Sequence, residues 1–337
     1  MTELASPQRP STETPSPRSP GISVQEYLHN DARPVPPVLR YDINEDFGTA
    51  PLDVDRYISR EYHDKEVEKV WRRVWQFVCR EDHIPNPGDH ITYDIANDKL
   101  IIMRQPDGSI KALYNVCLHR GRALRQEGGK VSELRCSFHG FTWNIDGSMK
   151  TLPCAWDFPE IDPDNFPLPE AKVATWNGFV FINQDPNAEP LEDFLGSFLN
   201  DWERWDYSDR YIYSHFGGVV DCNWKVAGEA FIEGFHSLAT HPQMMEWLGD
   251  ENTQYDVIKG ENWNRQIVPQ GVPSPTIANH ISEQEVLDSY YETRAFYTQG
   301  KGRDLAVGED GIPRVPEGST ARRELAAAMR SALAEMS

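Results

Sequence analysis

The spacing of apolar residues changes along the chain, and each change predicts an element. Apolar side chains recur every three or four positions at Val67, Val70 and Val74, which is the period of a helix. The period shortens in the segment WQFVC that follows, as is typical of a strand. A helix is therefore expected to lead into a sheet near residue 75.

Short apolar runs separated by turn dipeptides occupy residues 90–150. Asp107-Gly108 and Asp146-Gly147 stand between such runs. Asp-Gly is a strong hairpin signal because both residues of the turn tolerate a positive φ. Antiparallel β structure is expected here and onward through KVATWNGFVFINQ, and a helix in EPLEDFLGSFLNDW indicates a boundary near residue 190.

Helix signals dominate the last third of the chain. YIYSHFGGVVDCNWKV predicts a strand that runs into a helix opening near Asn223, a favourable N-cap residue. Ser282 and Glu285 form a capping box, which predicts a second helix start. From Ser319 onward the apolar positions 325, 329, 333 and 336 share one face, so an amphipathic helix is expected to reach the last residue without a stop signal.

Composition limits the kinds of partner that the protein can bind. The formal net charge of -20 argues against nucleic acid or an anionic membrane surface, because both are polyanions. We find no apolar run long enough for a membrane span and no signal-peptide pattern, so we expect a cytoplasmic protein with a small-molecule substrate. Five scattered cysteines do not make a disulfide framework. Cys79, Cys154 and Cys222 have no ligand-spaced partner and are expected to be small buried hydrophobes.

Four potential metal ligands lie in two matched pairs. One residue separates Cys117 from His119, two residues separate Cys136 from His139, and sixteen residues lie between the pairs. Packing does not explain four such ligands near the ends of predicted strands and hairpins. Tetrahedral zinc is the alternative, although zinc fingers usually pair Cys with Cys and His with His.

The order C-x-H then C-x-x-H, with glycines after both histidines, resembles the Rieske iron–sulfur motif. The resemblance implies a [2Fe-2S] cluster in which Cys117 and Cys136 bind one iron and His119 and His139 bind the other. High-potential respiratory Rieske proteins carry a disulfide at two positions that lack cysteine here. The chain therefore resembles the lower-potential type found in ring-hydroxylating oxygenases and their ferredoxins.

A second group of candidate ligands follows about a hundred residues later. Glu229, Glu233 and His236 stand four and three residues apart, which places them on one face of a continuous helix. His241 is too far round for that face. Pro242 predicts that the helix ends before it, which lets His241 turn back. Taken alone, such residues are more often structural or exposed.

After a Rieske motif, the order N-W-K, Glu, E-x-x-H-x4-H resembles the iron site of the Rieske non-haem iron oxygenases. In that family two histidines and one carboxylate hold Fe(II) and leave positions open for O2. His236 and His241 match the two histidines. Glu233 matches an acidic residue that links the two metal sites, so the resemblance implies a catalytic role in which it contacts His236 and His139 of the partner subunit. Ala230 replaces an asparagine that is usual in the family.

The third iron ligand of the family lies well over a hundred residues beyond the histidines. Only 96 residues follow His241 (337 minus 241). Asp288, Glu324 and Glu335 are left unassigned. This distance, together with the uncapped final helix, predicts that the chain is truncated within its catalytic domain.

The resemblance implies an α+β fold, with an antiparallel β Rieske domain and a partial helix-grip catalytic domain. We expect a disordered tail at residues 1–20 and an N-terminal helical segment at residues 21–70 that packs on the catalytic domain. The Rieske [2Fe-2S] domain is expected at residues 71–190 and the incomplete catalytic domain at residues 191–337. Family members are commonly homotrimers.

The implied function is that of an oxidoreductase, the terminal component of an aromatic-ring-hydroxylating oxygenase. The resemblance implies that electrons from NAD(P)H arrive through a separate reductase, with or without a ferredoxin, and the lack of a dinucleotide fingerprint in the chain agrees with this. They pass through the cluster to Fe(II), and O2 is incorporated into an aromatic or related hydrophobic substrate. The alternatives are a Rieske-type electron carrier, or a ligand-binding protein without oxygenase activity because the third iron ligand is absent.

Overall fold

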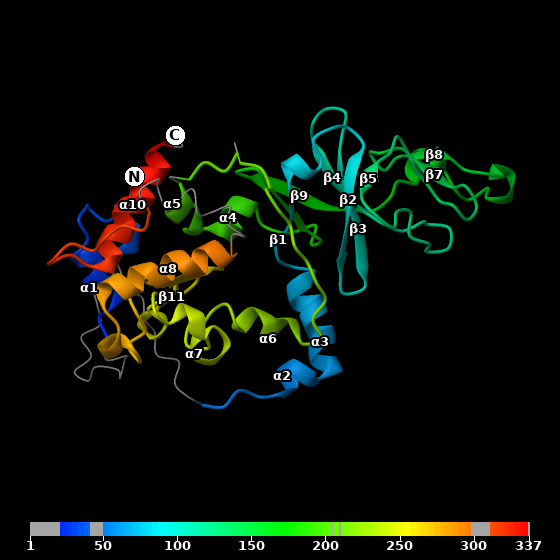
Figure 1. Cartoon of the computed structure of the whole chain (residues 1–337). Coiled ribbons are helices and arrows are strands. Elements are labelled where there is room, and N and C mark those ends of the chain that lie inside the picture. The colour runs from blue at the N-terminus through cyan, green and yellow to red at the C-terminus, as the bar shows by residue number, and fades with distance from the viewer. Residues whose placement is uncertain (1–20, 41–49, 204, 209, 298–310, 336–337) are drawn as a thin grey trace. The chain divides into compact units, whose positions relative to one another are not determined.

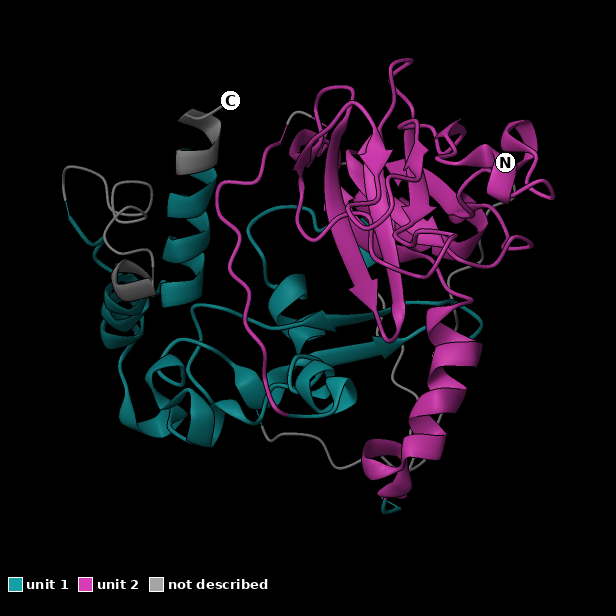
Figure 2. Ribbon diagram, turned by 90° about the vertical axis from the view of Figure 1, so that its right-hand side faces the viewer, with its two compact units in different colours: residues 1–51, 222–337 teal, residues 52–221 magenta. Residues whose placement is uncertain are grey.

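The structure is a computed structural model that describes residues 21–40, 50–203, 205–208, 210–297 and 311–335 (Figure 1). The chain divides into two compact units, one of residues 52–221 and the other of residues 1–51 with 222–337 (Figure 2). The expected disordered tail at residues 1–20 lies outside the described residues. Within the described part, no helix combines the length and the apolar character that a membrane crossing needs.

Residues 52–221 are built on two antiparallel sheets, as the hairpin signals predict. The larger sheet has the strand order β1-β10-β9-β4-β3-β2-β5, and the smaller sheet has the order β6-β7-β8. The strands are β1 Gln76–Arg80, β2 Asp89–Ile95, β3 Asp98–Arg104, β4 Ile110–Tyr114, β5 Gly129–Lys130, β6 Leu134–Arg135, β7 Thr142–Trp143, β8 Met149–Thr151, β9 Glu170–Trp176 and β10 Phe179–Asn183.

The Asp-Gly turns form hairpins, but their geometry differs from the expectation. Only the glycines take a positive φ, 85° at Gly108 and 89° at Gly147. The aspartates instead accept hydrogen bonds from backbone amides two residues later, at 2.9 Å to Asp107 Oδ1 and 2.8 Å to Asp146 Oδ1. These Asx turns close the loops with one left-handed residue each.

Along the chain, the α-helices of this unit precede β1 and follow β10. The helices are α2 Asp55–Ile58, α3 Arg60–Glu66, α4 Leu191–Leu195 and α5 Phe198–Trp202. A π-helical turn, Val67–Trp71, continues α3 and leads into β1, so the predicted passage from helix to sheet is confirmed. The single helix predicted in EPLEDFLGSFLNDW is wrong, because Gly196 takes φ 52° and ψ -130° and separates α4 from α5.

Strand β3 connects the core to the cysteine loops. Residues 100–103 are all 0% exposed. Successive side chains of a strand point to opposite faces, so Leu100 and Ile102 join one hydrophobic cluster and the other two residues of the run join a second. The second cluster also contains Cys117 and Cys136. The two cysteines are therefore backed by the most buried strand of the sheet.

The other unit has a core between two long helices. Its elements are α1 Val24–His29, α6 Trp224–Glu229, α7 Ser237–Thr240, α8 Glu283–Tyr297, α10 Ala321–Glu335, β11 Gln254–Val257 and β12 Asn264–Ile267. Leu287 of α8 and Leu325 of α10 are buried in one hydrophobic cluster with Trp247. The capping box is confirmed, since the backbone amide of Ser282 donates to Glu285 Oε2 at 2.8 Å. The predicted amphipathic helix near the end of the chain is confirmed as α10, and its expected extension to the last residue lies outside the described residues.

Residues 21–40 contact the segment of β11 and β12. Asn252 Nδ2 donates to the Ile22 carbonyl at 2.7 Å, and Gln25 Nε2 donates to Gln254 Oε1 at 2.9 Å. Residues 52–70, in contrast, group with the sheet-bearing unit. The boundaries at residues 70 and 190 remain predictions.

The segment before α6 differs from the expectation. No strand forms in residues 211–222, all of which the structure describes. Asn223 caps the helix as predicted, with its Oδ1 accepting from the Lys225 amide at 3.0 Å. The predicted continuous helix through residue 236 is wrong, because α6 ends at Glu229 and α7 begins only at Ser237.

Candidate metal centres

The two cysteine loops have the same backbone pattern although their sequences differ. The Gly121 amide donates to the Cys117 carbonyl at 2.8 Å, and the Gly140 amide donates to the Cys136 carbonyl at 3.0 Å. Each cysteine amide donates to the carbonyl five residues later, at 2.8 Å in both loops. Gly121 and Gly140 take φ values of 76° and 80°, which favour glycine. Two matched turns thus present their cysteines in the same way.

The cysteine sulfurs accept backbone hydrogen bonds from equivalent positions. The amides of the second and third residues after each cysteine donate to its sulfur, and the two thiols hydrogen-bond each other. Burial raises the pKa of the Cys117 thiol, and the contact with the Cys136 thiol adds to this rise, so both outweigh the lowering by the His119 and Arg120 amides. Burial also pushes the pKa of Cys136 upward, but the Phe138 and His139 amides and the Cys117 thiol lower it on balance.

The two histidines of the loops lie edge to face beside the thiols. The ring centroids of His119 and His139 are 4.7 Å apart with an interplanar angle of 70°. The His119 ring stacks on Phe141 at 4.7 Å and meets Phe158 at 5.8 Å. His139 is exposed and lies against Phe138, at 3.9 Å between centroids. Aromatic side chains therefore fix both imidazoles while one of them keeps access to solvent.

Asn115 secures the first loop, and the motif did not reveal it. Its Oδ1 accepts from the Leu124 and Arg125 amides at 2.8 and 2.9 Å, and its Nδ2 donates to the Arg125 carbonyl at 2.8 Å. Asn115 is only 3% exposed. A polar residue just before the first cysteine, at the end of an apolar strand, was the available signal.

The second centre is organised by one carboxylate. Glu233 Oε1 lies 2.6 Å from His236 Nδ1, and Glu233 Oε2 accepts from the His236 amide at 3.1 Å. The carboxylate thus engages both the ring and the backbone of the same histidine. This contact leaves His236 Nε2 as the ring nitrogen available to a metal.

His241 turns back toward His236, as Pro242 predicted. Helix α7 ends at Thr240, and His241 has φ -131° and ψ 51°, outside the helical region. The ring centroids of His236 and His241 are 5.3 Å apart with an interplanar angle of 71°. The pair therefore forms across the end of α7, and the break after Glu229 does not prevent it.

The described residues contain no third ligand at this centre. They include no group of three or more His, Cys, Asp or Glu side chains arranged to hold one metal ion. Asp288 lies on α8, where its Oδ1 accepts from Gln284 Nε2 at 2.9 Å. The side chain of Glu335 lies outside the described residues.

Family models match both parts of the chain. Residues 74–162 match the Rieske [2Fe-2S] domain, and residues 199–326 match the ring hydroxylating alpha subunit (catalytic domain). The chain therefore combines a Rieske [2Fe-2S] domain with the catalytic domain of a ring hydroxylating alpha subunit. The expected α+β fold, with a Rieske domain followed by a catalytic domain, agrees with these matches.

Several oxygenase subunits are similar to this chain. The chlorobenzene dioxygenase alpha subunit of Cupriavidus sp. (strain PS12) is 31% identical over 224 residues, which are 63% of this chain and 50% of the relative. The carnitine monooxygenase oxygenase subunit of Acinetobacter pittii (strain PHEA-2) is 29% identical over 216 residues, which are 62% of this chain and 57% of the relative. The chain thus spans about half the length of these curated relatives.

Solved structures of two kinds resemble the Rieske chain. Naphthalene 1,2-dioxygenase from Rhodococcus sp. bound to indole has a TM-score of 0.51 and 27% identity, over 62% of this chain and 51% of that one. A quaternary ammonium Rieske monooxygenase in complex with L-carnitine has a TM-score of 0.56 over 83% and 94% of the two chains. At 22% identity, the second likeness concerns the fold alone.

The two matched domains imply a [2Fe-2S] cluster and a mononuclear iron. The described residues fit the cluster better than they fit the mononuclear iron. The cysteine loops of the Rieske domain offer two buried sulfurs, each with backbone donors, and two adjacent imidazoles. This donor set suits a cluster with two cysteines and two histidines. The second centre offers two imidazoles, which suit iron but do not complete a ligand set.

The remaining cysteines of the Rieske chain behave differently from one another. Cys79 is 2% exposed, and burial raises the pKa of its thiol to about 12, as expected for a small hydrophobic core residue. The same expectation is wrong for Cys154 and Cys222, which are exposed. Both lie on segments that connect helices and strands, and the expectation of burial considered the residue type and not this position.

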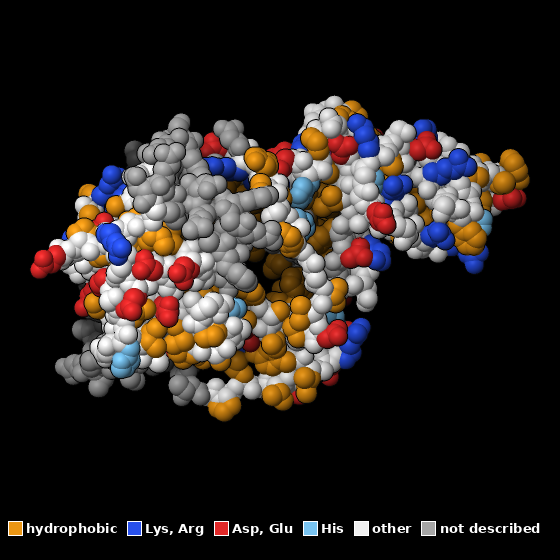
Figure 3. Space-filling view, viewed as in Figure 1, with side chains coloured by type: hydrophobic (Ala, Val, Ile, Leu, Met, Phe, Trp, Pro, Cys, Tyr) orange, Lys and Arg blue, Asp and Glu red, His pale blue; other side chains and the backbone are white. Residues whose placement is uncertain are grey.

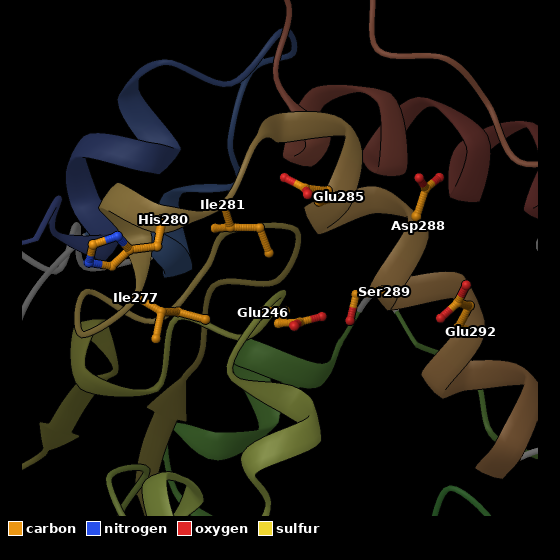
Figure 4. A pocket seen from close by; sticks show the side chains of 8 residues that line it. All are labelled: Glu246, Ile277, His280, Ile281, Glu285, Asp288, Ser289 and Glu292. Carbon is orange, nitrogen blue, oxygen red and sulfur yellow. The ribbon is translucent and has the colours of Figure 1, made fainter.

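A pocket of about 440 Å³ lies beside α8 (Figure 4). Its lining includes the carboxylates of Glu246, Glu285, Asp288 and Glu292, and Glu246 points toward Ser289. Neither candidate iron ligand lines it.

Hydrophobic side chains gather on the surface over α6 and α7 (Figure 3). Phe231 and Phe235 are 82% and 63% exposed there.

Proposed function

We propose that this chain is the cluster- and iron-bearing part of a terminal oxygenase. In this proposal, Cys117 and Cys136 hold one iron of the [2Fe-2S] cluster, and His119 and His139 hold the other. The observation that carries it is the pair of matched loops, which bring two buried sulfurs and two imidazoles together. Such a cluster takes up and passes on one electron at a time.

His236 and His241 are proposed as ligands of a mononuclear Fe(II), which supplies O2 chemistry when bound. Glu233 accepts the hydrogen bond of His236 Nδ1 and so fixes the tautomer with Nε2 directed to the metal. Because both oxygens of Glu233 are anchored on His236, its remaining lone pairs have a fixed direction. We also propose a homotrimer, in which a carboxylate held this way accepts a second imidazole N–H, that of His139 of the partner subunit.

The proposed substrate is an aromatic or related hydrophobic molecule, as the names of the chlorobenzene and benzene dioxygenase relatives suggest. Electrons come from NAD(P)H through a reductase, with or without a ferredoxin. We place the protein in the cytoplasm, acting with small molecules and without nucleic acid or membrane. An electron carrier or a ligand-binding protein is the second candidate, favoured by the lack of a third ligand at the second centre among the described residues.

Iron and sulfide counting on anaerobically reconstituted protein tests the proposal. A Rieske-type EPR signal with about three irons and two sulfides per chain supports the oxygenase, and about two irons supports the carrier or ligand-binding alternative. Consumption of O2 with NADH, a reductase and a panel of aromatic compounds then tests the activity. A colourless protein without Rieske-type EPR would refute both the oxygenase and the electron carrier, because each requires a cluster.

A further inference from the structure

One side chain from outside the turn holds the backbone between Glu233 and His236. The Gly234 amide donates to the hydroxyl oxygen of Tyr255 at 2.7 Å. This amide belongs to the residue directly after Glu233. The hydrogen bond therefore fixes the peptide that leads from the carboxylate to the histidine it engages.

The same turn is pressed against the segment that precedes Tyr255. Gly234 is buried, and a Cβ atom added to it would lie 2.8 Å from Thr253 Oγ1 and 2.9 Å from the Asp250 carbonyl oxygen. Thr253 Oγ1 donates to that carbonyl at 2.6 Å, which holds this wall in place. The turn therefore has little freedom to shift on this side.

Tyr255 is carried by a well-anchored strand. It lies on β11 and is paired with Gln266 of β12. The next side chain, Asp256, is 0% exposed and accepts from Gln254 Nε2 at 2.9 Å and from Arg265 Nε at 2.8 Å. A buried ion pair on one face of the strand thus fixes the position from which the Tyr255 hydroxyl reaches Gly234 on the other side.

We propose that Tyr255 is a positioning residue for the second metal centre. By accepting the Gly234 amide, its hydroxyl keeps Glu233 against His236 and so orients the imidazole toward the metal. The inference rests on the proposed function, since it requires His236 to be a ligand. Groups that orient a ligating histidine typically contribute 10- to 100-fold to metal affinity, so about a tenfold effect is expected.

The experiment measures Co(II) binding to the full chain with its cluster reconstituted. Tyr255→Phe removes the acceptor and keeps the ring. Tyr93→Phe is the control for loss of a tyrosine hydroxyl elsewhere, because the Tyr93 hydroxyl donates to Gln76 Oε1 at 3.0 Å in the other unit. His236→Ala defines background binding. We expect Tyr255→Phe to raise the dissociation constant of Co(II) about tenfold and to change its visible absorption and EPR spectra. The cluster spectrum and the melting temperature should stay as in the parent protein.

The outcomes separate the inference from the function on which it rests. If the parent chain binds Co(II) and Tyr255→Phe binds it with the same affinity and spectrum, the positioning role is overturned and the proposed function stands. If the parent chain binds no more Co(II) than His236→Ala, both are overturned. If Tyr255→Phe unfolds, the hydroxyl is a general stability element and the positioning role is overturned. Unchanged binding by Tyr93→Phe is required for support.

Discussion

The two candidate centres differ in how much of each is made locally. All four proposed cluster ligands lie within residues 117–139, on two loops closed by their own backbone hydrogen bonds. The second centre has two histidines within six residues, and its geometry depends on Tyr255 and Asp250 from later in the chain. Local hydrogen bonds can complete the first centre, whereas long-range packing must complete the second.

Burial shows the same contrast. Phe141, beside the cluster loops, is 2% exposed, whereas Phe235, next to His236, is 63% exposed. A metal held among buried side chains is protected from water and from competing ligands. Variants of the two centres should therefore fail in different ways, the first by losing the cluster and the second by losing affinity or coupling.

The largest effect is expected from removing a cluster cysteine. Cys136→Ser removes a buried sulfur that receives two backbone hydrogen bonds, and serine is a poor ligand for iron in a cluster. We expect complete loss of the Rieske-type EPR signal and visible colour. Cys154→Ser is the control, since Cys154 is exposed, and its spectra should match the parent protein. A coloured Cys136→Ser protein would contradict the assignment.

A variant of the second centre should lower the activity without affecting the cluster. Glu233→Gln keeps the size of the side chain but removes the charge that holds His236 Nδ1. We expect O2 consumption with reductase and substrate to fall about 10- to 100-fold, while dithionite still reduces the cluster fully. Glu292→Gln, an exposed carboxylate on α8, should leave both unchanged. Equal rates for the parent and Glu233→Gln would remove Glu233 from the mechanism.

A pair of glycines tests how tightly the second centre is packed. Gly234→Ala places a Cβ atom 2.8 Å from Thr253 Oγ1, so we expect about 1–3 kcal/mol lower free energy of unfolding. Gly228→Ala in α6 meets no atom within 4 Å and should raise it by about 0.5–1 kcal/mol through helix propensity. Denaturant unfolding measures both. Opposite signs are expected, and a neutral Gly234→Ala would show that the turn is loose.

The smallest effect concerns pH and the sheet-bearing unit. Burial, with the nearby Arg125 guanidinium, lowers the pKa of His90, so the folded ring stays neutral where the unfolded one is protonated. Stability is therefore present above the unfolded pKa of about 6.5 and is lost as pH falls toward the folded pKa. The decrease in melting temperature from pH 7.5 to pH 5.5 should be smaller in His90→Gln than in the parent protein. Equal decreases would exclude His90 as the cause.

Local patterns predicted the elements whose signals are complete within a few residues. The capping box at Ser282, the N-cap at Asn223 and the Asp-Gly hairpins all formed where expected. The expectation of a single helix carrying Glu229, Glu233 and His236 used spacing alone, and this helix did not form. Glu233 and His236 still meet, through a turn rather than a helical face.

The sequence by itself determined the family, the antiparallel character of the Rieske region and the candidate ligands, because each depends on residue types at short, fixed spacings. Only the tertiary structure decided the burial of the two cysteines against β3, the exposure of Cys154 and the hydrogen bond of Tyr255 to Gly234. These contacts join segments up to some twenty residues apart or depend on burial. Sequence spacing carries no information about either until the chain has folded.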